Sequence, residues 1–360
     1  MSGPARPTFP PARRGPGAGG GLGSGRRRGE GGDEAVRLTN DDAAGAKVSC
    51  VAAGYLRDGF VGSFVRSGRR ARRPPLINRG YWSRVQALRQ LLLAFLGDHP
   101  DGQVVVLGCG YDTTFFKLAA EGEARGRWWE VDFPQVAASK ARVVTGDAKF
   151  TAHLGDEAGR EVDLARGSVA AGRYTLCAGD LREMAEVGAR LRAAGLDPDA
   201  PTFVLSECVL VYLPPEASEA VVAYFGGAFA RCTFVVYEMV EPGDGFGQQM
   251  VRNLQDRGCE LLGIHANPTC AAQEARLRRA GFAEARALDM LAVYGGFLDA
   301  GERRRIERLE LFDELEEWRL IQQHYCIAVG TKGPPGLDGL GFRAAPAPGG
   351  AGRAPGSPPP

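Results

Sequence analysis

Short apolar runs alternate with amphipathic stretches through the middle of the chain. The runs have the length and composition of buried strands, and five of them cover residues 104–107, 127–133, 174–179, 202–206 and 233–237. Apolar spacing typical of a helix is found before and between these runs, as at Val85, Leu88, Leu92 and Phe95. This alternation predicts an α/β fold with a mostly parallel, doubly wound sheet.

The first of these runs leads into a glycine turn, QVVVLGCGYDTT, at residues 103–114. Gly108 and Gly110 allow a sharp turn and close approach of a ligand to the backbone. Asp112 and the two threonines after it are a suitable helix start. A strand, a glycine turn and a helix N-terminus together present backbone amides to a nucleotide-like ligand. A GxG sequence also occurs in turns that only serve packing, so the residues downstream decide between the two interpretations.

Acidic residues follow three of the later strands. Asp132 lies 22 residues beyond Gly110, the position of a ribose-binding acid, and it can also cap the helix that begins near Pro134. Asp180 starts an Asp-x-x-Glu sequence, which is typical of a helix cap. Glu207 ends the fourth strand. Because parallel strands end at one edge of a sheet, we expect these acids and Gly108 to lie together there.

Two cofactors suit such an edge, a nicotinamide dinucleotide and S-adenosylmethionine. The dinucleotide fingerprint GxGxxG requires a glycine where this chain has Thr113. An adenosyl cofactor has no pyrophosphate to approach that position. It can use Asp132 for its ribose and Asp180 for its adenine. The residues therefore favour S-adenosylmethionine.

Arg79 and Arg84 lie in an apolar and aromatic segment, INRGYWSR, just before the glycine strand. Helical spacing that begins at Val85 predicts that Arg84 lies in the first turn of a helix. An arginine is unfavourable there, which indicates an anionic partner. That partner is either a ligand or a structural carboxylate.

The ends of the chain differ in composition from its middle. Residues 1–32 contain 16 Gly or Pro, and residues 334–360 contain 15. Such segments bury too little apolar surface to fold, so we expect disordered tails at 1–33 and 334–360 around one domain at 34–333. Within that domain, we expect residues 241–323 to cover part of the pocket.

Charge and motif content exclude several classes of function. Residues 1–32 carry a net +5 and residues 334–360 a net +1, so residues 33–333 carry −5 of the formal net charge of +1. This balance does not predict nucleic-acid binding. The sequence has no apolar segment long enough to cross a membrane and no secretory h-region, so we expect a cytoplasmic protein, acting as a monomer. The four His are scattered and no CxxC occurs, which predicts neither a metal site nor a disulfide framework.

Six motifs, in order, resemble the leucine carboxyl methyltransferases: INRGYWSR, LGCGYDTTFFKL, EVDFP, ECVLVYL, GDGFGQ and HYCIAVGTKG. The resemblance covers about residues 36–333. It implies a class I S-adenosylmethionine-dependent methyltransferase fold and methylation of the C-terminal leucine α-carboxylate of the protein phosphatase 2A catalytic subunit, which regulates phosphatase assembly. Carried over by motif, the residues implied to line the cofactor pocket are Lys47, Arg84, Gly108, Asp132, Asp180, Leu181 and Glu207.

A terminal carboxylate is ionised at neutral pH, so it can attack a sulfonium methyl without a general base. Arg79 and Tyr212 are candidates to position it, and Tyr212 is equally compatible with a core aromatic. We expect the folded phosphatase surface as well as its tail to be recognised. Two alternatives remain: a methyltransferase acting on another carboxylate or on transfer RNA in wybutosine synthesis, and an inactive relative that binds the phosphatase. The Gly/Pro-rich sequence after residue 333 does not predict the kelch propeller of the wybutosine enzyme.

Overall fold

The computed structural model describes residues 30–66 and 71–343 and has a nine-stranded sheet at its centre. The strands lie in the order β3-β4-β5-β2-β1-β6-β7-β9-β8. Their bounds are β1 (Gln103–Leu107), β2 (Arg127–Asp132), β3 (Glu161–Asp163), β4 (Ser168–Ala171), β5 (Tyr174–Ala178), β6 (Thr202–Glu207), β7 (Cys232–Met239), β8 (Glu284–Asp289) and β9 (Tyr325–Lys332). The five runs predicted as strands are β1, β2, β5, β6 and β7.

The centre of the sheet is parallel and its edges are antiparallel. β5, β2, β1, β6 and β7 run parallel to one another, whereas β9 pairs antiparallel with both β7 and β8. Without the hairpin β3–β4, the sheet has the strand order and single reversed strand of class I methyltransferases, which confirms the expected fold. The hairpin was not predicted, because its strands have only three and four residues and little continuous apolar sequence.

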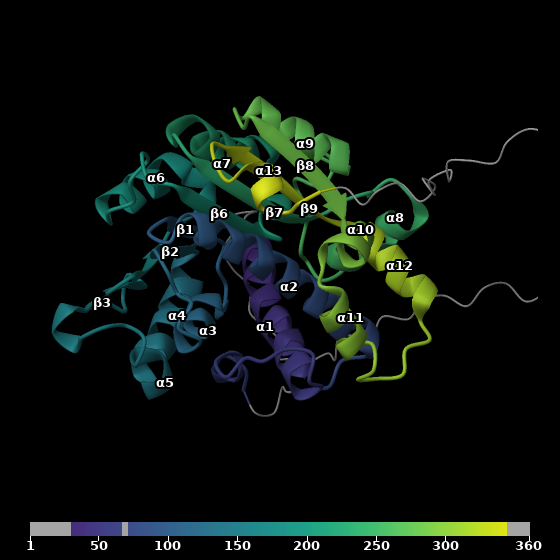
Figure 1. The fold of residues 1–360 in the computed structure, drawn as a ribbon, viewed down its shortest axis with the longest axis horizontal. Helices are drawn as coiled ribbons and strands as arrows, with labels where there is room; N and C mark the ends of the chain where they lie inside the picture. Colours follow the sequence, from purple (N-terminus) through teal and green to yellow (C-terminus); the bar gives the residue numbers. More distant parts are fainter. Residues whose placement is uncertain (1–29, 67–70, 344–360) are drawn as a thin grey trace, which may run out of the picture.

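Helices cover both faces of the sheet (Figure 1), with α6, α7 and α9 on one side and α2, α3 and α4 on the other. The helices are α1 (Glu30–Ala52), α2 (Pro75–Asp98), α3 (Thr114–Ala120), α4 (Pro134–Gly146), α5 (Ala148–Thr151), α6 (Met184–Ala193), α7 (Pro215–Ala228), α8 (Gly245–Gln255), α9 (Cys270–Arg279), α10 (Met290–Ala292), α11 (Ala300–Ile306), α12 (Leu315–Gln323) and α13 (Gly336–Gly339).

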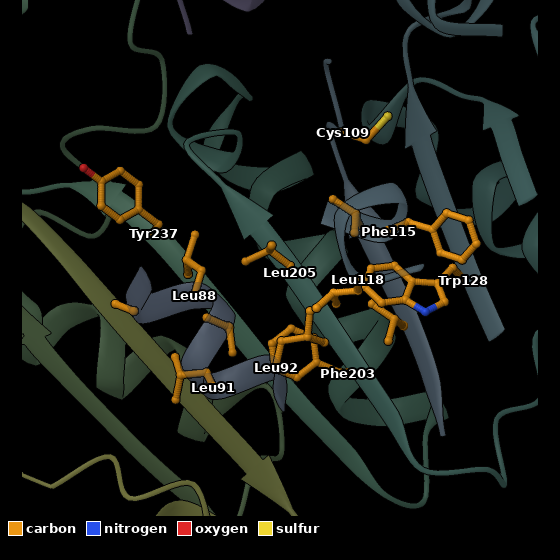
Figure 2. Close-up of a cluster of buried hydrophobic side chains, with 14 of the residues drawn as sticks. Leu88, Leu91, Leu92, Cys109, Phe115, Leu118, Trp128, Phe203, Leu205 and Tyr237 are labelled. Atoms are coloured by element: carbon orange, nitrogen blue, oxygen red, sulfur yellow. The ribbon is translucent and has the colours of Figure 1, made fainter. Parts of the chain in front are cut away.

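The two faces of the sheet bury separate apolar clusters, and β1 contributes to both. Val104 and Val106 face the cluster that includes Leu88 of α2, whereas Val105 and Leu107 face the opposite one. Figure 2 shows part of the first cluster, where leucines of α2 lie beside residues of α3 and the sheet. Burial on both faces explains why β1 is a continuous apolar run rather than an alternating one.

The first two helices begin earlier than predicted. α1 starts at Glu30, within the predicted tail, and α2 starts at Pro75. Arg84 is therefore the tenth residue of α2, and the prediction that it lies in a first turn was wrong. Proline is favoured as the first residue of a helix, and the interior Gly80 costs a helix only about 1 kcal/mol. Both effects allow α2 to start upstream of the apolar spacing.

The boundary predicted for the C-terminal tail is also corrected. Residues 336–339 form α13, and Leu337, Leu340 and Phe342 are buried against the α2 side of the sheet. These three apolar side chains supply the burial that the Gly/Pro count did not consider. The rest of both predicted tails, 1–29 and 344–360, lies outside the described residues.

No helix in the described parts of the chain is long and apolar enough to cross a membrane.

A fully buried ion pair lies behind the glycine turn. Lys140 Nζ is 2.6 Å from Glu130 Oε2, and Tyr174 donates a hydrogen bond of 2.5 Å to the same oxygen. All three residues have no exposed surface. A buried charge is strongly unfavourable without its partner, so this pair should matter for stability mainly when one member is removed.

We predict that Lys140→Met lowers the free energy of unfolding by about 3–5 kcal/mol, since it leaves the Glu130 carboxylate unpaired. The double variant Lys140→Met, Glu130→Gln should recover more than half of this loss, because a neutral glutamine still accepts from Tyr174. Urea denaturation of both variants measures the difference. Equal losses in the single and double variants would contradict the prediction.

Candidate functional site

The carboxyl ends of β2, β1 and β6 place three of the predicted site residues side by side. Leu107, the last residue of β1, pairs with Val131 and Ser206. The next residues along each strand are Gly108, Asp132 and Glu207, so these three are neighbours at one edge. The predicted grouping at the strand ends is therefore present in the structure.

Both glycines of the turn after β1 are required by its shape. Gly108 and Gly110 have φ of 59° and 48°, a region that favours glycine. A Cβ at Gly108 would lie 2.5 Å from Cγ2 of Val209, and one at Gly110 would overlap the side-chain oxygen of Asn40. The turn is thus closely packed between the β6 side of the site and α1.

The Asp132 carboxylate holds this turn in place. Its Oδ2 accepts a hydrogen bond of 2.6 Å from the Gly110 amide, and its Oδ1 accepts one of 2.7 Å from the Phe133 amide. Its hydrogen bonds to these two amides lie outside α4, so it does not cap that helix. Burial raises the pKa of Asp132 to about 6, although both amides favour the ionised form. Each oxygen keeps acceptor capacity for a further donor such as a hydroxyl.

Asp180 follows β5 and has the capping role that its sequence indicated. Its Oδ1 accepts from the Arg182 amide at 2.9 Å and caps the short 3-10 helix η4 (Leu181–Glu183). The Arg182 guanidinium also bonds both carboxylate oxygens of Asp180, and it reaches Asp33 of α1 at 2.9 Å. Leu181 is buried beside them. The carboxylate remains partly exposed, so capping does not exclude contact with a ligand.

Arg84 reaches the same edge from α2. Its Nε donates a hydrogen bond to Glu207 Oε1, and its guanidinium carbon lies 4.4 Å from the centre of the Tyr237 ring and 5.5 Å from that of Tyr81. Burial disfavours the charged form of Arg84, but Glu207, with smaller contributions from Tyr237 and Tyr81, raises the pKa of the guanidinium. The structural carboxylate considered for Arg84 is therefore Glu207, itself a site residue.

Lys47 joins this group from α1 through an aspartate that the sequence analysis did not assign to the site. Its Nζ lies 3.3 Å from Asp112 Oδ2. Burial opposes the charge of Lys47, while Glu207 and Asp112 together raise its pKa. Burial would raise the pKa of Asp112, yet Lys47 and Lys140 help to lower it to about 2. Asp112 thus fixes the ammonium group, and its only sequence signal was its position as a helix start.

Helix α1 lies across the strand ends with one polar face. Asp33, Asn40 and Lys47 are spaced by seven residues, which places them along one side of a helix. They contact Arg182, Gly110 and Asp112 respectively. This spacing was a readable signal in the sequence, and the contacts show that α1 covers the edge.

The structure separates the two candidates for holding an acceptor carboxylate. Tyr212 ends the short helix η5 (Leu210–Tyr212), five residues after Glu207, and packs with Tyr325 and residues of α8. Arg79 lies on another side of α2 from Arg84, since five residues correspond to a rotation of about 140°. Its guanidinium carbon is 3.9 Å from the centre of the Phe312 ring. The structure therefore does not bring Arg79 to the strand-end residues.

The sequence motifs GDGFGQ and HYCIAVGTKG, to which no role was assigned from the sequence, meet at α8. Asp244 caps α8 by accepting from the Gly247 amide at 2.7 Å, and its Oδ1 lies 2.9 Å from Nε2 of His324. The other ring nitrogen of His324 lies 2.7 Å from the Leu320 carbonyl oxygen. The GDGFGQ and HYCIAVGTKG motifs thus fix the position of α8, which packs beside Tyr212.

Glu238 is a further residue that the sequence analysis did not assign to the site. It lies within β7, although the strand was predicted to end at Tyr237, and it is 1% exposed. Its Oε1 accepts from the amides of Val209, Leu210 and Val211. Burial raises the pKa of Glu238 to about 7, against the effect of Arg276 and these amides. A carboxylate in an otherwise apolar strand was its sequence signal.

Among residues 30–66 and 71–343, no group of three or more His, Cys, Asp or Glu side chains is arranged to hold a metal ion.

The family model for leucine carboxyl methyltransferases matches residues 32–226. A leucine carboxyl methyltransferase 1 homolog of Arabidopsis thaliana is 44% identical over 86% of this chain and 92% of its own length. Leucine carboxyl methyltransferase 1 of Bos taurus is 35% identical over 84% of this chain and 91% of its own. The tRNA wybutosine-synthesizing protein 4 of Homo sapiens is 40% identical over 83% of this chain, which spans only 44% of that protein.

Similarity to solved structures is much weaker. An O-methyltransferase family protein from Burkholderia thailandensis has a TM-score of 0.39 and 13% identity, over 84% of this chain and 70% of its own. A likeness of this size supports no conclusion about function. The family match covers more than half of the chain, and the full-length relatives confirm the resemblance and the prediction of a methyltransferase enzyme. The chain belongs to the leucine carboxyl methyltransferase family.

Proposed function

We propose that this enzyme transfers the methyl group of S-adenosylmethionine to the α-carboxylate of the C-terminal leucine of the protein phosphatase 2A catalytic subunit. The product is a leucine methyl ester, which regulates phosphatase assembly. Family membership supports the reaction, and one structural observation supports it for this chain in particular. Buried charges of both signs, Arg84 with Glu207 and Lys47 with Asp112, converge on the glycine turn at the strand ends.

The residues at this edge fit an adenosyl cofactor. Asp132 offers buried acceptor oxygens for ribose hydroxyls, and Asp180 with Leu181 lies where the adenine would be held. Arg84 and Lys47 would hold the methionyl carboxylate, and Glu207 its ammonium group. Gly108 and Gly110 give the turn the positive φ values and the close packing that hold it at this edge. When bound, S-adenosylmethionine supplies an electrophilic methyl group on its sulfonium.

The task of the protein in this reaction is alignment and exclusion of water. A leucine α-carboxylate has a pKa of about 3.3–3.7 and is ionised at neutral pH, so the site needs no general base. Arg84 is held in one orientation by Glu207 and by the Tyr237 ring, which prepares its guanidinium for a carboxylate. Tyr212 is placed at the α8 side of the site to contact the acceptor. Helices α1 and α8 keep water from the reacting groups.

We propose that the enzyme recognises the folded phosphatase as well as its tail. The elements that surround the site are large compared with what a short peptide needs. They include α1 across the strand ends and, within the 241–323 region, α8 beside Tyr212.

Transfer RNA is the second candidate acceptor. The observation in its favour is the 40% identity with a tRNA wybutosine-synthesizing protein, which exceeds the 35% identity with the bovine leucine carboxyl methyltransferase. The net charge of −5 on residues 33–333 opposes it, because a polyanionic substrate is bound through excess positive charge. Methyl transfer therefore has to be tested directly with both acceptors, the phosphatase catalytic subunit and transfer RNA.

We expect the purified enzyme to transfer labelled methyl from S-adenosylmethionine to the phosphatase catalytic subunit in a base-labile form, as a methyl ester requires. The label should be absent when the subunit lacks its terminal leucine and when the enzyme carries Asp132→Ala. Transfer RNA is assayed in parallel as the alternative acceptor. Label on transfer RNA or on another acid would replace the phosphatase as substrate. Phosphatase binding without any turnover would indicate an inactive relative.

The raised pKa of Asp132 predicts a pH dependence of cofactor affinity. Ribose hydroxyls donate to the ionised carboxylate, so binding lowers the pKa of Asp132 from its ligand-free value of about 6. Affinity for S-adenosylhomocysteine should therefore be constant above pH 6 and decrease below it, by about tenfold per pH unit for one proton. Calorimetry between pH 5 and 8 measures this. Asp132→Asn should bind more weakly with no such decrease. The same decrease in Asp132→Asn would assign the titration to another group.

Two arginines of α2 form a matched pair of variants. Arg84→Ala removes a charged hydrogen bond and should weaken S-adenosylhomocysteine binding by about 10–100-fold. Arg89→Ala removes an exposed ion pair with Glu121, which is 2.6 Å long, and should leave affinity unchanged. Titration calorimetry of both variants at one pH makes the comparison. Equal affinities in the two variants would show that Arg84 does not contact the cofactor.

A further inference from the structure

We propose that Glu238 is a positioning residue of the transfer reaction, which holds the turn from Cys208 to Tyr212 so that Tyr212 faces the acceptor. This inference rests on the proposed function, and it adds a residue that does not itself contact either substrate. It explains why an acidic side chain lies within a buried strand next to the site.

The contacts of Glu238 are concentrated on one short segment of backbone. Its Oε1 accepts hydrogen bonds from three successive amides, at 3.0 Å from Val209, 2.8 Å from Leu210 and 3.3 Å from Val211. Three consecutive amides that converge on one oxygen form an anion-binding nest in the backbone. The carboxylate of Glu238 thus stabilises the turn after β6 rather than β7, the strand that contains it.

The turn needs this support because its backbone is unfavourable. Cys208 has a φ of 60°, a region that is unfavourable for a residue other than glycine. The convergent amides also have to find an acceptor, since an unpaired buried amide is costly. One carboxylate oxygen satisfies all three and so selects this conformation over a more extended one.

The two ends of the turn both reach the site. Glu207 precedes it and binds Arg84, and Tyr212 ends it and packs with Tyr325 and α8. A change in the turn would therefore move Tyr212, while Glu207 stays fixed by Arg84 and by its place in β6. This predicts a larger effect on the acceptor than on the cofactor.

Glu284 provides a matched control. It also accepts from a backbone amide, that of Leu337 at 2.8 Å, and from the Thr331 hydroxyl at 3.1 Å. It lies at the start of β8, at the opposite edge of the sheet from the site. Glu284→Ala should lower thermal stability without changing methyl transfer.

Hydrogen exchange tests the contact without relying on activity. In Glu238→Ala, the amides of residues 209–211 should exchange at least tenfold faster than in the wild type. Glu238→Gln should keep most of the protection, since its side-chain carbonyl accepts from the same amides. Glu284→Ala should leave the turn unchanged. Unchanged protection of the turn in Glu238→Ala would overturn the proposal.

Steady-state kinetics, normalised to the number of cofactor-binding sites, tests the positioning. Glu238→Ala should lower kcat/KM for the protein acceptor at least tenfold, with a raised acceptor KM and a cofactor Kd within threefold of wild type. Glu238→Gln should restore kcat/KM to within threefold. Normal acceptor kinetics in Glu238→Ala would overturn the proposal. If the wild type transfers no methyl, the proposed function fails instead, and the exchange experiment still decides whether Glu238 holds the turn.

Discussion

The hydrogen bond from the Gly110 amide to the Asp132 carboxylate joins the two parts of the molecule on which the site depends. One is the glycine turn after β1, and the other is the end of the neighbouring β2. The turn requires positive φ at two residues, so its shape is stable only when its amides have a fixed acceptor. The acceptor is buried, and its direct donors among the described residues are amides rather than a cation. Asp132 therefore keeps an incompletely satisfied charge that a hydroxyl donor can complete.

The sheet and the covering helices contribute opposite charges to this edge. The strand ends supply the carboxylates of Asp132, Asp180 and Glu207, while α1 and α2 supply Lys47 and Arg84. Each cation is paired with an acid before any ligand binds. Pairing offsets part of the desolvation penalty that each charge has in a partly buried site. Such pairs also suit a zwitterionic ligand, which can interact with both members of a pair.

The sequence predicted the parts of the molecule that depend on local patterns. The apolar runs located the parallel strands, and the strand-end acids located the edge, because strand length and register follow from burial on both faces. The family resemblance implied Lys47 of α1 at the site, but the course of α1 across the strand ends was not predicted, since its contacts with Gly110 and Asp112 join residues 65 or more positions apart. Arg84 and Arg79 lie in one motif, yet helix rotation directs only Arg84 to the site. The start of α2 at Pro75 decides this geometry, and the apolar spacing that begins at Val85 did not reveal it.

Glu207 of β6 and Glu238 of β7 lie one position apart in the paired strands, and this difference gives them separate roles. In the parallel pair of β6 and β7, Glu207 lies opposite Tyr237, so these two side chains share one face of the sheet. Arg84 approaches from α2 on that face and contacts both of them. Glu238 is the next residue, and its side chain points to the opposite face, where the charge of Arg276 in α9 partly offsets the effect of burial on its pKa. The backbone after β6 bends toward that face, and Val209 and Leu210 pack in its apolar cluster. Glu207 is therefore available to a cation at the ligand edge. Glu238, only one position further along the paired strands, faces the turn after β6 instead.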